Sequence, residues 1–473
     1  MKNTLRRIIE FIWIIPWKPS KKNDDNNDED DQFYDAFEQP PVHSPLSDSD
    51  SLSEDSFRRY DRPPISAQTS PLLESPWSSY AEQPAMAPVD ENYVGLITSL
   101  VREEGHIYSL AASGDLLYTG SSSKNIRIWK HYVEYSGFKS HSGLVKAILI
   151  SGDKVFTGHQ DGKIRVWKPA KKDPKFHQKI ATLPDFHSVF KKSLKLKNYK
   201  QIRRKNRGEI WIKHIDAISS LSLNFDHTLL YSGSWDKTIK VWRVSDFKCL
   251  ESISAHDDVI NTVVAGAYGF VFSGSADGTL KVWRKDSTWE GKRTRHCFSQ
   301  SLLKQEFAVT SLVVTPSATV VYGGCSDGVV HYWEHEKLTH RGVLRGHKLA
   351  VLCLAAYGDM VFSGSADRNI CVWQRDEHGT HRCLYVLNGH TGPVKCLAVE
   401  KERRGPDGGA GGGENTCILY SGSLDKSVKI WRLCSHSDRQ LPPPSPKRID
   451  GLRRSRAEIR DKLPRPRASQ RKN

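Results

Sequence analysis

The chain has 473 residues, a hydrophobic fraction of 38% and a formal net charge of +16. Globular domains are usually about 45–50% apolar on a scale that also counts Gly, so part of this chain is expected to lie outside any core. Nine cysteines are scattered without CxxC pairs, which argues against a disulfide framework and a zinc ribbon and favours a reducing compartment.

Residues 1–17 form a short amphipathic or apolar segment. Its longest apolar run, from Ile8 to Trp17, is interrupted by Glu10 and Pro16 and is shorter than the roughly 20 residues that a membrane span needs. No small-residue cleavage site follows, so neither a transmembrane segment nor a signal peptide is expected. Two interpretations stay open: a partner-docking helix, or weak peripheral membrane contact through residues 5–17.

Residues 18–92 are expected to be a disordered acidic tail rich in Ser and Pro. Residues 24–31 form an acidic block, and the remainder offers too little apolar surface to offset the entropy of ordering. Ser44, Ser70 and Ser75 each precede a proline, and phosphorylation at these sites is left open.

A repeat occupies the middle of the chain. Segments of the form apolar-Ser/Thr-Gly-x-x-Asp-x-x-apolar-x-apolar-Trp recur, and seven terminal tryptophans are separated by 38, 75, 41, 50, 40 and 58 residues: Trp129, Trp167, Trp242, Trp283, Trp333, Trp373 and Trp431. Alternating apolar residues before each Trp, preceded by Asp-Gly or Asp-Lys turns, indicate strands. Four short strands per unit of about 40 residues are typical of a β-propeller blade. We therefore predict an all-β, seven-bladed propeller over residues 94–434, with its blades numbered by these tryptophans.

Five blades carry a His, a hydroxyl, an Asp and a Trp at matching positions: His141, Thr157, Asp161, Trp167; His214, Ser232, Asp236, Trp242; His256, Ser273, Asp277, Trp283; His347, Ser363, Asp367, Trp373; and His390, Ser421, Asp425, Trp431. Five identical sets in one chain argue for a structural role and against a hydrolase triad. The residue types suit a buried hydrogen-bond relay of carboxylate, imidazole, hydroxyl and indole. Blades 1 and 5 depart from this set, with Glu103, Ser123, Gln305 and Gly323 at relay positions, and are expected to be the least well tied.

These motifs resemble those of WD-repeat β-propeller proteins, and Gly346-His347 and Gly389-His390 make the likeness specific. No copy has the Trp-Asp dipeptide itself. A finer resemblance, to plant WD-repeat proteins of the Jingubang type, rests on the run from Lys197 to Ala217 and on blades 3–4. It implies a non-catalytic plant regulator of growth or development, of the pollen type. A substrate receptor of a cullin-RING ubiquitin ligase is disfavoured because no Trp-Asp-x-Arg box is present.

Ring closure is expected to use the N-terminal strand. After Trp431 only a Pro-rich basic tail remains, whereas Val94 to Leu100 aligns with the outer-strand sequence Cys249 to Ser254. We therefore predict that this N-terminal strand pairs with residues 427–432 and removes both open edges.

Family geometry implies which residues face partners. One position per blade, just inside the innermost strand, is expected on the top face: Tyr108, Lys146, Ser219, Asn261, Thr310, Leu352 and Lys395. A second set precedes each turn Asp: Ser122, Gln160, Trp235, Ala276, Ser326, Ala366 and Leu424. Trp235 is the strongest candidate, because an exposed Trp is a typical hot-spot residue. The alternative is that Trp235 packs against the neighbouring insertion.

Blade 2 holds a basic insertion, residues 168–207, with fourteen Lys or Arg against two Asp, a net of +12. Asp185 is expected to cap a helix from Phe186 to Leu196 with Phe186, Val189, Phe190 and Leu194 on one face and Lys191, Lys192 and Lys195 outward. A hairpin is expected to follow, carrying Arg203, Arg204 and Lys205. This patch has three open interpretations: a solvated face, a site for acidic protein segments, including the chain's own residues 24–31, or a site for nucleic acid or anionic lipid.

No enzyme is expected. The Gly-rich loop within residues 401–416 of blade 7 lacks a phosphate-binding Lys, and no HExxH or Cys/His metal spacing occurs, so no cofactor or metal is predicted. The expected function is a scaffold, a monomeric propeller that binds other proteins such as transcriptional regulators. A nucleic-acid or chromatin-associated binder that acts through the two basic segments is the alternative.

Residues 435–473 are expected to be a disordered, Pro-rich basic tail. Residues 432–473 hold thirteen Lys or Arg against four Asp or Glu, a net of +9. Lys447-Arg448 and the cluster from Arg453 to Arg456 suit nuclear import receptors, so cytoplasm and nucleus are both predicted locations.

Overall fold

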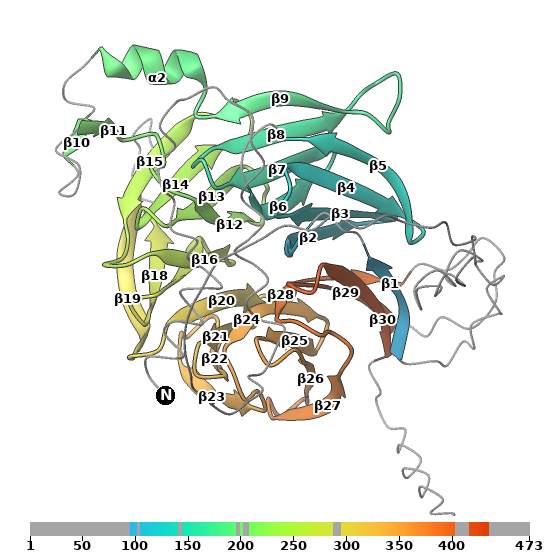
Figure 1. The fold of residues 1–473 in the computed structure, drawn as a ribbon. Helices are drawn as coiled ribbons and strands as arrows, with labels where there is room; N and C mark the ends of the chain where they lie inside the picture. Colours follow the sequence, from blue (N-terminus) through green and yellow to red (C-terminus); the bar gives the residue numbers. More distant parts are fainter. Residues whose placement is uncertain are drawn as a thin grey trace, which may run out of the picture. The chain divides into compact units, whose positions relative to one another are not determined.

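Seven four-stranded antiparallel sheets make up most of the described residues (Figure 1). The computed structural model describes residues 95–101, 105–140, 144–194, 199–201, 208–286, 295–402 and 416–434. All of them belong to one compact unit. The expected blade architecture is confirmed.

In blades 1 to 6 the strands follow the chain order from the innermost to the outermost. Blade 1 holds β2 (Ile107–Ser113), β3 (Leu116–Ser121), β4 (Asn125–Lys130) and β5 (Val133–Lys139). Blade 2 holds β6 (Val145–Ser151), β7 (Lys154–His159), β8 (Ile164–Pro169) and β9 (His177–Leu183). Blade 3 holds β12 (Ile218–Leu223), β13 (Leu229–Ser234), β14 (Thr238–Arg243) and β15 (Cys249–Ser254). Blade 4 holds β16 (Ile260–Ala265), β17 (Phe270–Ser275), β18 (Thr279–Lys285) and β19 (His296–Lys304).

The remaining blades repeat this plan. Blade 5 holds β20 (Val309–Val314), β21 (Val320–Cys325), β22 (Val329–Glu334) and β23 (His340–Arg345). Blade 6 holds β24 (Val351–Tyr357), β25 (Met360–Ser365), β26 (Ile370–Arg375) and β27 (His381–Leu387). Blade 7 holds β28 (Val394–Lys401), β29 (Thr416–Ser423), β30 (Ser427–Cys434) and β1 (Gly95–Val101). Between blades 2 and 3 lie helix α2 (Phe186–Ser193) and the small sheet of β10 (Tyr199–Gln201) and β11 (Gly208–Ile210).

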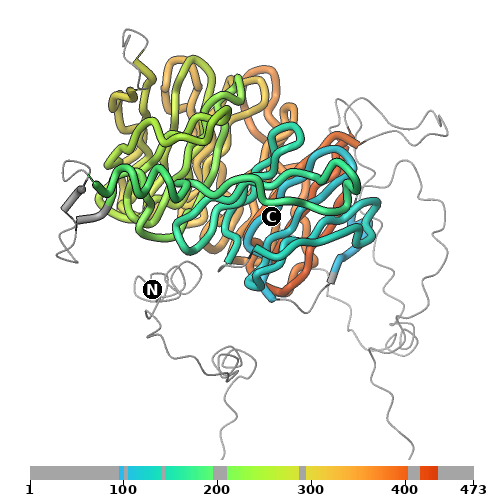
Figure 2. The backbone as a smooth tube through the Cα atoms, turned by 90° about the horizontal axis from the view of Figure 1, so that it is seen from above, coloured from blue at the N-terminus to red at the C-terminus, as the bar shows by residue number. Residues whose placement is uncertain are grey.

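The N-terminal strand closes the ring. β1 pairs antiparallel with β30 from Gly95–Arg432 to Val101–Ser427, so the first described strand is the outermost strand of the last blade (Figure 2). This register confirms the predicted closure. Backbone groups at the edge of β30 are paired by β1 and are not left open to other chains.

Seven apolar clusters, one between each pair of neighbouring blades, form the core. Between blades 2 and 3, for example, Phe156 and Ile164 pack with Leu230 and Trp242. Between blades 7 and 1, Ile430 packs with Ile107 and Trp129. Each blade buries one face against the preceding blade and the other against the following blade, so no blade completes its core alone.

Tyrosine–histidine hydrogen bonds tie three pairs of blades together. The hydroxyl oxygens of Tyr118, Tyr231 and Tyr322 lie 3.1, 3.1 and 2.6 Å from Nε2 of His177, His296 and His381. In each case the tyrosine is in the second strand of one blade and the histidine begins the outermost strand of the next blade. The sequence analysis did not identify these pairs.

Candidate functional site

The predicted relay is present as hydrogen bonds in blades 3, 4, 6 and 7. In blade 3, His214 Nδ1 lies 2.8 Å from Asp236, His214 Nε2 lies 2.8 Å from Ser232 Oγ, and the indole N–H of Trp242 donates to Ser232 over 2.9 Å. Equivalent bonds join the relay residues of the other three blades. Four repeats of one buried arrangement identify the relay as a structural element of the blade.

Protonation states in blade 3 follow from the surroundings of the relay. Burial lowers the pKa of His214, although Asp236 opposes this shift. Burial would raise the pKa of Asp236, but His214 and Thr238 lower it well below its usual range. A neutral imidazole beside a carboxylate donates from Nδ1 to the carboxylate and accepts the hydroxyl proton at Nε2. Every polar group of the relay therefore has a partner.

In blade 2 the described residues around the predicted relay make two local contacts. Asp161 accepts two hydrogen bonds from the Arg165 guanidinium, at 2.7 and 3.2 Å, and the imidazole beside Thr157 is that of His159, at 2.8 Å. Trp167 still donates to Thr157 over 2.8 Å. His141 lies outside the described residues. Arg165 and Asp161, four residues apart, form a local ion pair, and the predicted contacts of His141 stay a prediction.

Blades 1 and 5 differ in how far they lose the relay. In blade 1, Trp129 donates its indole N–H to Thr119 over 3.1 Å, and Ser123 Oγ accepts the backbone N–H of Asn125. Glu103 lies outside the described residues. In blade 5, Trp333 is 1% exposed and its indole N–H has no acceptor among the described residues, because Gly323 supplies no hydroxyl. Blade 5 thus carries the larger defect.

Both sets of predicted top-face positions lie at one end of the propeller. Each residue of the first set lies where the pairing register of an innermost strand shifts, as Lys146 does between Val145 and Ala147. Such β-bulges turn a side chain out of the regular alternation. Each residue of the second set donates its backbone N–H to the carbonyl oxygen of the residue that precedes the innermost strand of the same blade, over 2.9–3.1 Å.

Several of these positions are not available to a partner. Asn261 is 4% exposed and donates to the carbonyl oxygen of Val309 in the next blade over 2.9 Å. Thr310 likewise donates to Val351 over 2.5 Å. Lys395 is 9% exposed. The expectation that Asn261 and Lys395 offer exposed side chains is therefore wrong, because the bulges direct some side chains into the seam between blades.

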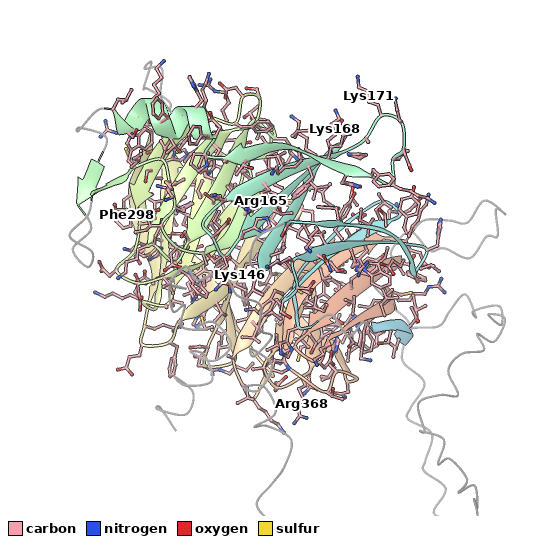
Figure 3. All side chains as sticks on the ribbon, turned by 45° about the horizontal axis from the view of Figure 1, so that its top comes forward. Lys146, Arg165, Lys168, Lys171, Phe298 and Arg368 are labelled. Carbon is pink, nitrogen blue, oxygen red and sulfur yellow. The ribbon has the colours of Figure 1, made fainter. Side chains whose placement is uncertain are left out.

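Lys146 of blade 2 joins aromatic side chains from two other blades. Its Nζ lies 4.3 Å from the ring centroid of Trp235 in blade 3 and 5.5 Å from that of Tyr108 in blade 1. All three residues are half-buried. Trp235 is therefore not fully exposed, and it packs against Lys146. In Figure 3, Lys146 lies near the middle of the propeller. We call Tyr108, Lys146 and Trp235 the three-blade cluster.

Two lysines at this end of the propeller have lowered pKa values. Burial lowers the pKa of Lys146 to about 8, while Asp216 opposes the shift. Burial, together with the charge of Lys146, lowers the pKa of Lys395 to about 7. Two amines in one poorly hydrated region repel each other when both are charged. An anionic group placed near them would reduce this electrostatic repulsion.

The basic insertion is folded differently from the prediction. Asp185 caps helix α2, accepting the Ser188 N–H over 2.9 Å, but the helix ends at Ser193. Lys192 turns inward, with Nζ 3.8 Å from the ring centroid of Trp211, whereas Lys191 is exposed. The expected outward position of Lys192 is therefore wrong. The hairpin appears as β10 and β11, and Lys195, Arg203, Arg204 and Lys205 lie outside the described residues.

Among the described residues, no group of three or more His, Cys, Asp or Glu side chains is placed to hold a metal ion. In the same part of the chain, no helix has the length and hydropathy of a membrane span.

Comparison with known protein families agrees with the blade geometry. The model described as "WD domain, G-beta repeat" matches residues 97–130, 133–168, 209–243, 247–284, 338–374 and 381–432. The chain belongs to the WD-repeat family. The matched segments leave out residues 285–337, which include three strands of blade 5 and its unpaired Trp333. WD-repeat propellers are generally non-catalytic interaction scaffolds.

Individual relatives share only part of the chain. Cell division control protein 4 of Saccharomyces cerevisiae is 28% identical over 224 residues, which is 46% of this chain and 24% of that protein. The human kinesin-like protein KIF21B is 26% identical over 45% of this chain and 13% of its own length. The ribosome biogenesis protein WDR12 homolog of Nematostella vectensis is 27% identical over 46% of this chain and 44% of its own length. The chain thus spans less than half the length of each of these relatives.

Proposed function

We propose that this WD-repeat chain is a non-catalytic scaffold that binds partner proteins at the end of the propeller that carries the three-blade cluster. The observation that carries the proposal is the convergence of Tyr108, Lys146 and Trp235 from three blades. Half-buried aromatic side chains around a cation offer a partner both apolar area and charge. The charge of Lys146 also lowers the pKa of Lys395, so the two amines lie close together at this end of the propeller.

The finer role is proposed from the sequence. The resemblance to Jingubang-type plant proteins supports a regulator of growth or development, with transcriptional regulators among its partners. The basic clusters of residues 435–473 support a nuclear pool beside a cytoplasmic one. Both statements concern the whole protein.

Proximity labelling tests the scaffold. Wild type is compared with Trp235→Ala, and Phe225→Ala serves as the matched control, because Phe225 is an exposed aromatic of the same blade that follows the other end of β12. We expect Trp235→Ala to lose a defined set of neighbours that Phe225→Ala retains. Identical neighbour sets for wild type and Trp235→Ala would refute the proposed face.

A further inference from the structure

The outer edge of blade 2 exposes apolar and basic side chains together. Strand β9 is the edge strand of its sheet, and α2 follows it directly. Figure 1 shows both at the periphery of the ring. The name blade-2 rim is used for nine of the exposed apolar and basic residues of β9, of the hairpin before it and of α2 with its C-cap: Lys171, Lys172, Phe176, Lys179, Ile180, Phe186, Phe190, Lys191 and Leu194. Lys146 of the three-blade cluster, by contrast, lies near the middle of the propeller (Figure 3).

Helix α2 turns its apolar side to the solvent. Phe186, Phe190 and Leu194 are 83%, 54% and 71% exposed, and the rings of Phe186 and Phe190 stack with centroids 6.3 Å apart. Residues spaced by four share one face of a helix. The opposite face carries Lys192, which lies over the Trp211 ring. A surface helix normally packs its apolar face against the core and exposes its polar face. The opposite orientation of α2 indicates that its apolar face contacts a partner outside the propeller.

Charge surrounds this apolar face. Residues 168–194 contain seven Lys and two Asp. One of the two carboxylates, Asp185, is engaged as the helix cap. Lys171, Lys172, Lys179 and Lys191 are all exposed. In Figure 3, Lys171 lies at the outer surface, on the hairpin that leads into β9. The rim is therefore complementary to an anionic partner.

The shape of the rim separates the candidate partners. The lysines follow the hairpin, a seven-residue strand and a helix, which together extend over roughly 30 Å. An acidic peptide of about nine extended residues could span that length and pair with the lysines, but an acidic stretch offers no apolar layer to Phe186, Phe190 and Leu194. A nucleic-acid backbone would contact the lysines but would leave Phe186, Phe190 and Leu194 in water. An anionic membrane offers headgroups along the whole rim and an apolar layer just beneath them.

We propose that the blade-2 rim binds anionic lipid surfaces, with Phe186, Phe190 and Leu194 entering the boundary between headgroups and acyl chains and the exposed lysines contacting the headgroups. This contact is independent of the protein-binding face proposed above, which involves other residues nearer the middle of the ring. It would place the propeller beside a membrane with its partner-binding end still accessible.

Vesicle co-sedimentation of the full chain tests the proposal. The probes are vesicles of phosphatidylcholine alone and vesicles with about one third phosphatidylserine. All proteins carry Phe11→Asp and Ile12→Asp, so that the apolar residues 5–17 do not contribute. We expect binding to the phosphatidylserine vesicles, weaker binding to phosphatidylcholine, and a loss of binding at high salt.

Two sets of rim variants, each with a matched control, decide the outcome. Phe186→Ser, Phe190→Ser and Leu194→Ser together should weaken binding by about tenfold or more, because the apolar area no longer enters the bilayer. Phe225→Ser with Phe298→Ser removes exposed aromatics elsewhere and should have no effect. Lys171→Gln, Lys172→Gln and Lys191→Gln should weaken binding more than the same change at Lys285, Lys304 and Lys348, which are exposed lysines outside the rim.

Three results would overturn the proposal: no binding of the starting protein to phosphatidylserine vesicles, unchanged binding of the apolar rim variant, or equal losses in rim and control variants. Duplex DNA bound by the starting protein and the apolar variant alike, without vesicle binding, would reassign the rim to nucleic acid. Trp235→Ala should bind vesicles normally, so failure here and failure of the scaffold proposal are distinguishable.

Discussion

The hydroxyl oxygen of Tyr118 in blade 1 lies 3.1 Å from Nε2 of His177, the first residue of the outermost strand of blade 2. Burial raises the pKa of Tyr118 to about 12 and lowers that of His177, so the phenol is protonated and the imidazole is neutral. The phenol therefore donates to the imidazole. The same pairing joins blade 3 to blade 4 and blade 5 to blade 6, and it adds a polar contact between neighbouring blades to the apolar packing there.

Removing the tyrosine hydroxyl should weaken the interface between the two blades that its hydrogen bond joins. We expect Tyr118→Phe, Tyr231→Phe and Tyr322→Phe each to lower the free energy of unfolding by about 1 kcal/mol, since each leaves a histidine nitrogen without its donor. Tyr420→Phe is the matched control, because Tyr420 holds the same position in blade 7 without a histidine bond among the described contacts. Denaturant unfolding measures the four variants. Equal effects at all four positions would show that the histidine bonds contribute nothing specific.

Lowering the pH should reduce the free energy of unfolding of the propeller at pH values above those at which its carboxylates titrate. Burial, aided by Arg375, lowers the pKa of His381 to about 4, whereas an unfolded histidine titrates near 6.5. The unfolded state therefore takes up the proton first, and the free energy of unfolding falls as the pH drops from about 6.5 to about 4. We expect His381→Asn to show a shallower slope in this window, measured by urea unfolding at several pH values. An unchanged slope would mean that this histidine titrates normally in the folded chain.

A hydroxyl at position 323 should supply the missing acceptor in blade 5. A Cβ at Gly323 would lie 3.2 Å from the Trp333 ring and 3.3 Å from Leu280 and Leu312, which is tight. Gly323→Ala carries the packing cost alone, whereas Gly323→Ser carries the same cost and offers an oxygen to the indole N–H. We expect the serine variant to be more stable than the alanine variant by about 1 kcal/mol in thermal or urea unfolding. A serine variant no more stable than the alanine variant would contradict this account of Trp333.

Loss of β1 should open the ring. A chain that starts at residue 105 lacks the strand that pairs with Ser427 to Arg432, so the edge of β30 is unpaired and Leu100 leaves the core between blades 7 and 1. We expect a lower unfolding temperature and concentration-dependent self-association through the exposed edge, measured by calorimetry and size-exclusion chromatography. If the shortened chain melted and eluted as the full chain does, pairing of β1 would not be needed to close the ring.

Local patterns were sufficient to predict the blades and most of the relay. The Ser/Thr-Gly, Asp and Trp spacing lies within one hairpin, so the residues that cooperate are close in sequence, as Ser232 and Trp242 are. The top-face positions were also predictable, because each lies at a constant offset from a strand start. In blade 2, Arg165 contacts Asp161 and His159 contacts Thr157, and these two contacts were not predicted because both are common residue types that no spacing rule distinguishes.

The sequence by itself determined the repeat, the number of blades, the strand that closes the ring and the helix cap at Asp185, because each depends on short-range periodicity or on one unpaired strand. Only the tertiary structure decided which side chains meet across blades. Tyr118 and His177 are 59 residues apart, Lys146 and Trp235 come from different sheets, and the outward orientation of Phe186 and Phe190 depends on Lys192 reaching Trp211. Such contacts are set by how rigid blades pack around the ring, and a periodic pattern along one strand carries no information about that packing.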